Sequence, residues 1–235
     1  MSALLGEFIG SAALLLFGSG VVANVALNKT NGNQSGWIVI TFGWAMAVFI
    51  GVYTSVHLGG SGHLNPAVTL AMVAFKGFDA SLVPGYIAVQ LAGSFLGSVL
   101  AWLAYHKQFE ATTDADAKLA VFCTSPNINS PLHNVISEAI GAFALVFGAL
   151  CISPASSTLG TLDALPVSLL VLGIGLSLGG PTGYAINPSR DLGPRIAHFI
   201  LPIPNKRDSN WAYSWVPIVG PIIGALLAGW LFSLL

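Results

Sequence analysis

The chain has very few charged residues. Lys, Arg, Asp and Glu make up 7% of its 235 residues, whereas 54% are hydrophobic. A soluble domain needs a surface of which about 25–35% is charged, so this composition excludes an ordinary soluble protein and predicts an integral membrane protein. The 8 basic residues are balanced by 9 acidic ones. Because phosphate binding needs clustered Lys and Arg, we expect no nucleic acid among the partners.

Cysteine is scarce as well. Cys123 and Cys151 have no metal-ligand spacing, and Cys151 lies in an apolar run where we expect a thiol to pack. The 5 His residues are scattered, and no His-Glu-x-x-His, paired Gly-Asp or Ser-Lys pattern is present. We therefore expect no metal, no cofactor and no enzymatic activity.

Long hydrophobic runs are abundant, and the mean hydropathy is +0.79. A transmembrane helix needs about 20 apolar residues, and six runs reach that length. Two shorter runs reach only about half of the hydrocarbon thickness at about 1.5 Å per residue, which predicts re-entrant half-helices. We predict an all-α membrane protein formed by a single integral domain over residues 1–235. The predicted spans are 4–27, 36–58, 81–105, 134–153, 164–181 and 212–234, and the half-helices are 65–76 and 187–200.

Both short runs begin with an asparagine that is followed by a proline, in Asn65-Pro66-Ala67 and Asn187-Pro188-Ser189. Asparagine caps free N–H groups at a helix start, and proline suits the first helical position. A glycine-rich segment precedes each motif, at 59–64 and 179–186. Non-helical backbone inside a membrane is tolerated where it lines a water-filled cavity. One Asn-Pro dipeptide is only a turn signal, but two in matching positions predict a solute pathway.

The two halves of the chain repeat each other. Glu7-Phe8-Ile9-Gly10 matches Glu138-Ala139-Ile140-Gly141, which divides the chain into repeats at about 1–107 and 131–235 joined by an extramembrane loop. Each repeat holds three crossings, so the second must be inverted relative to the first, and the half-helices meet at the midplane. Glycine pairs that permit close helix packing are Gly93 and Gly97 in the first repeat and Gly220 and Gly224 in the second.

The paired Asn-Pro boxes, the two Glu-x-x-Gly starts and Arg190-Asp191 resemble the aquaporin, or major intrinsic protein, family over nearly the whole chain. Residues 187–195 have an Asp after the Arg and a basic residue four positions later, which is similar to the glycerol-facilitator branch, as is Val216-Pro217-Ile218. Two features depart from the pattern: Ser189 replaces Ala, and the first re-entrant loop is about one residue longer.

The resemblance implies a passive channel for glycerol, water and other small uncharged solutes that excludes ions and protons. It also implies a homotetramer with one pore per subunit, in the plasma membrane with cytoplasmic termini. Only Lys76 lies on the side of the termini, so the positive-inside rule places the termini outside; we follow the resemblance. A secondary transporter remains the alternative, since it also uses inverted repeats and broken helices. The loop cations on the opposite side are Lys29, Lys107, Lys118, Lys206 and Arg207.

The resemblance also assigns roles to single residues. The selectivity filter is Trp44, Gly175, Tyr184 and Arg190: the guanidinium donates to solute hydroxyls, the rings contact the polyol carbons, and the glycine leaves room for solute. Asn65 and Asn187 are at the pore centre, where their amides donate to solute and the half-helix N-termini repel cations. Backbone carbonyls of Ser61, Gly62, His63, Gly183, Tyr184 and Ala185 line the pore, and Glu7 and Glu138 accept hydrogen bonds from the re-entrant loops.

Several alternatives stay open on the sequence. Phe42 or Val48 could take the position given to Trp44. Arg190 could pair with Asp191 or Glu138 instead of facing the lumen, although we expect Asp191 to support the site through an ion pair with Arg195, four residues along a helix. With the orientation that the resemblance implies, we expect the external loop to contribute Asn127-Ile128-Asn129 to the outer vestibule.

Overall fold

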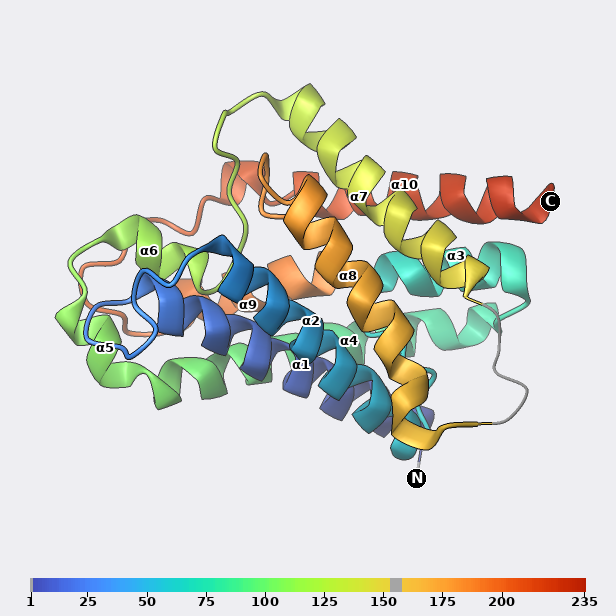
Figure 1. The fold of residues 1–235 in the computed structure, drawn as a ribbon, viewed down its shortest axis with the longest axis horizontal. Helices are drawn as coiled ribbons and strands as arrows, with labels where there is room; N and C mark the ends of the chain where they lie inside the picture. The colour runs from blue at the N-terminus through green and yellow to red at the C-terminus, as the bar shows by residue number, and fades with distance from the viewer. Residues whose placement is uncertain (1, 153–157) are drawn as a thin grey trace.

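The computed structural model describes residues 2–152 and 158–235, which form helices and connecting segments without any strand (Figure 1). Within these ranges six helices are long and apolar enough to cross a membrane, which confirms the predicted all-α architecture. Short 3-10 turns precede three of them: η1 (Ala80–Leu82), η2 (Gly160–Ala164) and η3 (Trp211–Tyr213). The six are α1 (Ala3–Ala26), α2 (Trp37–His57), α4 (Val83–Ala104), α7 (Pro131–Cys151), α8 (Leu165–Leu178) and α10 (Val216–Ser233).

Two shorter helices, α3 (Pro66–Lys76) and α9 (Pro188–Ile200), begin at the Asn-Pro motifs. The Oδ1 atom of Asn65 accepts a hydrogen bond from the Ala67 N–H at 2.9 Å. The Oδ1 atom of Asn187 accepts from the N–H groups of Ser189 at 3.0 Å and Arg190 at 3.2 Å. The prolines lie at the first helical position, where no N–H is needed. These two helices have the positions and lengths predicted for the half-helices.

The half-helices are exchanged between the two repeats. In each repeat the first and third spans pack together, α1 against α4 and α7 against α10. However, α3 packs mainly against α10 of the second repeat, and α9 packs against α4 of the first. The two repeats therefore interlock, and both are needed to hold the half-helices in place.

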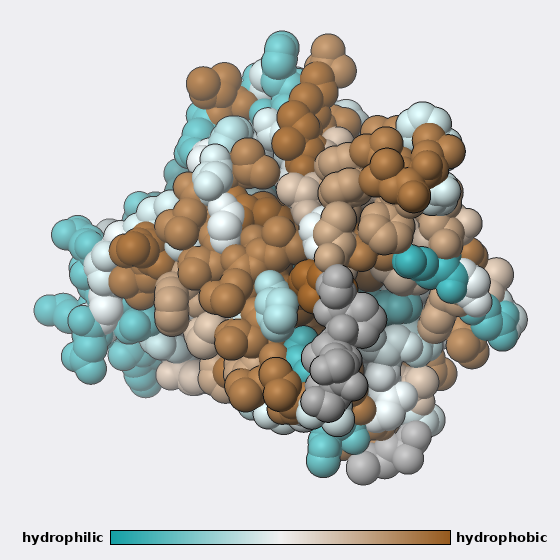
Figure 2. All heavy atoms as spheres, turned by 45° about the vertical axis from the view of Figure 1, so that its right-hand side comes forward, coloured by the Kyte–Doolittle hydropathy of each residue, from teal (hydrophilic) through white to brown (hydrophobic). Residues whose placement is uncertain are grey.

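The two termini lie on the same side of the molecule, away from α5 (His106–Ala111) and α6 (Ala115–Ala120), as an even number of crossings requires (Figure 1). Hydrophobic side chains cover a broad central region of the face in Figure 2, and hydrophilic ones gather toward its edges. Large apolar side chains such as Ile140 on α7 and Trp230 on α10 are exposed. A surface of this kind suits the hydrocarbon region of a bilayer.

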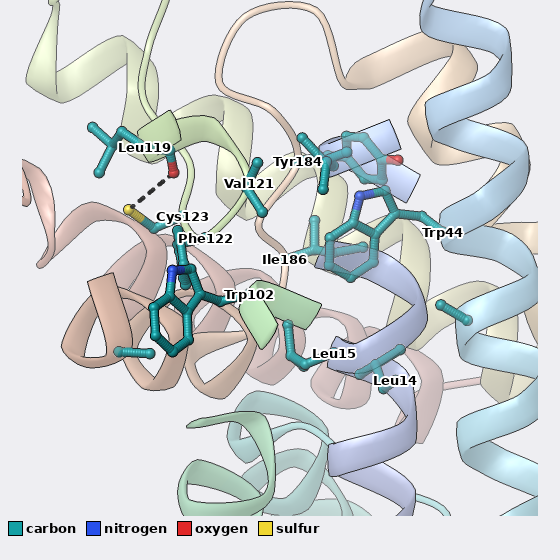
Figure 3. Packing of buried hydrophobic residues seen from close by; sticks show 14 of the residues in the cluster. Leu14, Leu15, Trp44, Trp102, Leu119, Val121, Phe122, Cys123, Tyr184 and Ile186 are labelled. Carbon is teal, nitrogen blue, oxygen red and sulfur yellow. Dashed lines mark hydrogen bonds between the residues drawn. The ribbon is translucent and has the colours of Figure 1, made fainter. Parts of the chain in front are cut away.

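The buried core joins the spans to the connecting loops. Figure 3 shows Trp102 of α4 close to Phe122 and Cys123 of the loop that follows α6, where the Cys123 sulfur approaches the Leu119 carbonyl at 4.0 Å. Our prediction that Cys151 packs in an apolar run is wrong: this thiol is exposed, because α7 ends at that residue.

The glycine pairs allow the spans of each repeat to come into backbone contact. A Cβ atom built on Gly97 of α4 would lie 2.2 Å from the Ala12 carbonyl oxygen of α1. At the matching position of the second repeat, a Cβ on Gly224 of α10 would lie 2.0 Å from the Ala139 carbonyl oxygen of α7. Because both neighbours are backbone atoms, they cannot move aside without shifting a whole helix. The tight pairing of these spans thus depends on glycine.

We expect Gly224→Ala to lower the free energy of unfolding by about 1–3 kcal/mol or more, since the new methyl group overlaps the α7 backbone. Gly173→Ala in α8 is the matched control, because a Cβ there has nothing within 4 Å. The measurement is thermal unfolding of each purified variant in detergent. Equal unfolding temperatures for the two variants would contradict the packing argument.

Candidate pore and selectivity filter

The loops that precede the half-helices contain several residues with positive φ angles. Gly62 and Leu64 have positive φ angles of 69° and 51°, and Tyr184 and Ile186 have 39° and 45°. Side-chain-bearing residues adopt such angles at a cost of about 1–3 kcal/mol each, so the surrounding structure must hold them in place.

Two buried glutamates provide this support. The Glu7 carboxylate accepts hydrogen bonds from the N–H groups of His63 at 3.0 Å and Leu64 at 2.8 Å. The Glu138 carboxylate does the same in the second repeat, with Ala185 at 2.9 Å and Ile186 at 2.8 Å. Each carboxylate binds two successive N–H groups through its two oxygens. The expected contacts between the glutamates and the loops are present.

Two further partners of Glu7 were not predicted from the sequence. The Ser55 hydroxyl donates to the carboxylate at 3.2 Å, and the Gln90 side-chain amide donates at 2.9 Å. Both side chains are buried. A polar residue in an apolar span is the signal that could have identified them, because such residues are costly in lipid and usually face a partner.

The direction of these N–H groups determines the direction of the neighbouring carbonyls. The described peptides are all trans, and in a planar trans peptide the C=O group points opposite to the N–H group of the next residue. Since the N–H groups of 63–64 and 185–186 point toward the glutamates, the preceding carbonyls point toward the other side of the loop. Those carbonyls belong to Gly62, His63, Tyr184 and Ala185, and all four residues line one cavity.

The two remaining residues of the predicted row are Ser61 and Gly183. Ser61 lines neither the cavity that contains Gly62 and His63 nor the larger cavity beyond Tyr184 and Arg190, and its hydroxyl group pairs with the Tyr86 hydroxyl at 2.9 Å. Gly183 lines only that larger cavity. That the carbonyls of Ser61 and Gly183 line the pore stays a prediction.

At the centre, each half-helix is linked to the loop of the opposite repeat. The Nδ2 atom of Asn65 donates to the Ile186 carbonyl at 2.9 Å, and Nδ2 of Asn187 donates to the Leu64 carbonyl at 2.8 Å. An amide NH₂ group has two hydrogens, so each asparagine keeps one for another acceptor. Both asparagines line the same cavity as the carbonyls. The tips of the two half-helices therefore meet.

Two cavities lie along this path. The inner one, of about 170 Å³, contains both asparagines and the four carbonyl-bearing residues. The other lies among the loops around α6, on the side away from the termini, and is called the outer cavity. It has a volume of about 780 Å³ and includes Asn127, whose side chain donates to the Gly180 carbonyl at 2.6 Å. Trp44, Tyr184 and Arg190 line both cavities. Figure 3 labels Trp44 on α2 and Tyr184 on the loop that precedes α9.

Of the three candidates on α2, Trp44 is the one at the junction of the cavities. It is 4% exposed. Phe42 is 52% exposed and lines neither cavity, and Val48 lines only the inner one.

The residues that surround Gly175 differ from our expectation. A Cβ at this position would lie 2.9 Å from Cζ of Tyr184 and 3.0 Å from Cγ2 of Thr41. The space that the glycine leaves is therefore occupied by the tyrosine ring, and Gly175 lines neither cavity. This corrects the expectation that the glycine leaves room for solute: it leaves room for Tyr184.

The charged residues of α9 divide into two groups. Asp191 binds Arg195 through Oδ1, at 2.8 Å to Nε, and binds the N–H and hydroxyl groups of Thr124 through Oδ2 at 2.8 Å and 2.7 Å. This buried ion pair joins the loop that follows α6 to α9. Among the described residues, neither Asp191 nor Glu138 contacts the Arg190 guanidinium, which lies 4.1 Å from the centre of the Trp44 ring.

A family model described as "Major intrinsic protein" matches residues 1–232. The chain belongs to the major intrinsic protein family. It is 52% identical to a probable glycerol uptake facilitator protein of Thermotoga maritima, with 99% of each chain covered. It is 50% identical to a glycerol uptake facilitator protein of Streptococcus pneumoniae, with 100% of this chain and 99% of that one covered. The X-ray structure of the aquaglyceroporin from Plasmodium falciparum matches with a TM-score of 0.87 and 30% identity, covering 98% of this chain and 94% of that one.

For this major intrinsic protein, we expect Glu138→Gln to be destabilising. A glutamine has one oxygen, so its NH₂ group would face the N–H of Ala185 or Ile186, at a cost of about 1.5–3 kcal/mol. Glu110→Gln is the matched control, because Glu110 lies at the surface and pairs with Lys107. Thermal unfolding in detergent measures both, and an unchanged midpoint for Glu138→Gln would show that the carboxylate does not hold the loop.

Proposed function

We propose that this chain is a passive channel for glycerol, water and other small uncharged solutes, and that it excludes ions and protons. The observation that carries the proposal is the junction of the two cavities at Trp44, Tyr184 and Arg190, directly outside the meeting point of the half-helices. The glycerol uptake facilitators among the relatives support glycerol as a permeant.

The chemistry of the junction suits a polyol. The faces of Trp44 and Tyr184 offer an apolar wall for the C–H groups of the solute. The Arg190 guanidinium offers five N–H donors for its hydroxyl oxygens. Farther inside, the carbonyls of the re-entrant loops accept from the same hydroxyls. A solute with alternating donors and acceptors on one side and carbon on the other matches all three surfaces.

Ion exclusion follows from fixed positive charge and from desolvation. The N-termini of α3 and α9 each carry about half an elementary positive charge and meet at the centre, and the Arg190 charge lies outside them. An ion at the bilayer centre costs at least about 2.5–3.5 kcal/mol on insertion scales. A neutral solute avoids both penalties.

Proton exclusion follows from the free hydrogens of Asn65 and Asn187. Their Oδ1 atoms and one hydrogen of each amide are already bonded, so only donors are left to face the lumen. A water molecule at the centre then accepts from the protein and must donate outward on both sides. A water chain oriented in this way cannot pass a proton along.

A passive channel is also favoured over the alternative, a secondary transporter. Coupling to an ion gradient needs a free acidic group at membrane depth. Glu7, Glu138 and Asp191 are each occupied by N–H donors or by Arg195, which supports a pathway without a coupling site. The major intrinsic protein family also indicates a channel and not an enzyme.

We also propose a homotetramer in the plasma membrane, with one pore per subunit and cytoplasmic termini. The apolar side chains exposed on the long helices support contact with lipid and with neighbouring subunits. The outer cavity, with α6 and Asn127, then opens to the outside.

In proteoliposomes we expect shrinkage and recovery after a glycerol gradient to be fast, non-saturating and independent of an imposed ion or proton gradient, because no group couples the solute to an ion. Light scattering measures the volume change. Dependence on a gradient would favour the transporter, and a steady sodium current during permeation would contradict the channel.

Shortening the aromatic side chains should alter the ratio of glycerol to water permeability. We expect Trp44→Ala and Tyr184→Ala each to change this ratio several-fold, about the effect of 1 kcal/mol, since each removes an apolar wall of the junction. Phe42→Ala is the control, because Phe42 lies on the same helix and faces away from both cavities. An unchanged ratio in both variants would refute the assignment of the filter.

A further inference from the structure

The Tyr184 ring is held at the junction of the two cavities by packing alone. The residue lies on the non-helical segment before α9. A buried tyrosine hydroxyl usually finds a hydrogen-bond partner, which fixes the ring. The Tyr184 hydroxyl is buried and has no such partner among the residues that the structure describes. The position of this ring therefore depends on the groups that pack around it.

The end of α8 forms one side of these surroundings. A Cβ on Gly175 would lie 2.9 Å from Cζ of Tyr184, and a Cβ on Gly179 would lie 2.5 Å from its Cδ1 atom. The ring thus packs directly on the backbone of α8 and of the residue that follows the helix. Because that backbone cannot move without shifting the helix, the ring has no room on this side.

Trp37, the first residue of α2, closes the edge of the Tyr184 ring. The two rings meet edge to face, with 5.8 Å between their centres and 80° between their planes. The Nε1 atom of Trp37 donates to the Gly175 carbonyl at 3.0 Å. That carbonyl lies in the last turn of α8, where carbonyls lack a partner inside the helix. The indole is therefore fixed to the same helix end on which the tyrosine ring rests.

We propose that Trp37 is a positioning residue that sets the width of the junction by holding the Tyr184 ring in place, and that it thereby sets the largest polyol that passes. The inference rests on the proposed function and adds a size limit to it. Trp37 lines the outer cavity but not the inner one, so it does not itself narrow the path between them. It acts through Tyr184, which lines both.

The location of Trp37 gives the direction of the effect. Because Trp37 lines the outer cavity, removing the indole opens space beside the Tyr184 ring on the outer side. Gly175 and Gly179 still close the side of α8, so the ring turns into the space that the indole leaves. A ring that turns outward withdraws from the junction. The junction then admits larger solutes.

The test compares erythritol with glycerol, because the four-carbon polyol is the next larger member of the same class. We expect Trp37→Phe to raise the ratio of erythritol to glycerol permeability about two- to tenfold, the effect of one edge-to-face contact. Trp211→Phe is the matched control. Trp211 is also 41% exposed and also meets a ring, that of Phe199, at 5.8 Å, but it lines neither cavity. Uptake of each radiolabelled polyol into proteoliposomes measures the ratio.

A second variant separates the hydrogen bond from the size of the side chain. The amino acid β-(3-benzothienyl)alanine has nearly the shape of tryptophan but carries sulfur in place of the N–H group, so at position 37 it cannot donate to Gly175. We expect a smaller rise in the same ratio, because the ring is then no longer fixed to α8. If Trp37→Phe does not insert into the membrane, this variant decides the question alone.

A merely structural role of Trp37 would lower both polyol fluxes together and leave their ratio unchanged, and that result would overturn the inference. A rise of equal size in Trp211→Phe would overturn it as well, as would erythritol uptake that stays at the level of empty vesicles in both position-37 variants. Loss of glycerol flux in the parent protein would refute the proposed function. Normal glycerol flux with an unchanged ratio would refute only the role of Trp37.

Discussion

The pore depends on a carboxylate that binds two successive backbone N–H groups in each repeat. A re-entrant loop has to leave its N–H groups or its carbonyls without a helical partner, and unpaired groups at membrane depth are costly. Glu7 and Glu138 accept hydrogen bonds from the N–H groups on the face of each loop that packs against the protein. The carbonyls then point to the opposite side, where solute can supply the missing hydrogen. One interaction thus both stabilises the loop and creates the acceptors of the pathway.

The centre of the pore is formed by both repeats together. Asn65 donates to the loop of the second repeat and Asn187 to the loop of the first, and each half-helix packs on a long helix of the other repeat. Neither half alone can place its own asparagine. The geometry at the midplane is therefore fixed by contacts between segments far apart in the sequence, and the solute path exists only once the two repeats have interlocked.

The sequence predicted the spans, the half-helices and their caps, because these depend on length, hydropathy and local chemistry that a single segment carries. It could not choose among Phe42, Trp44 and Val48. In a bilayer the outer face of α2 is as apolar as its inner face, so the pattern of hydrophobic residues does not reveal which side faces the lumen. The surroundings of Gly175 could not be predicted from the sequence either, because the space beside that glycine is occupied by Tyr184 from a distant loop. Ser55 and Gln90 were missed because single polar residues in an apolar run do not identify their partner.

Arg190 and Arg195 show why a residue type alone does not assign a role. Both are arginines on α9, and both are buried. The donors of Arg195 bind Asp191, Thr124 and Ser209, so its hydrogen bonds hold the loop that follows α6 against the half-helix. The donors of Arg190 have no such acceptor in the described part of the chain, so they stay available to whatever enters from the outer cavity. An arginine with all its donors bonded would give the proposed filter a charge but no binding capacity, whereas Arg190 offers both.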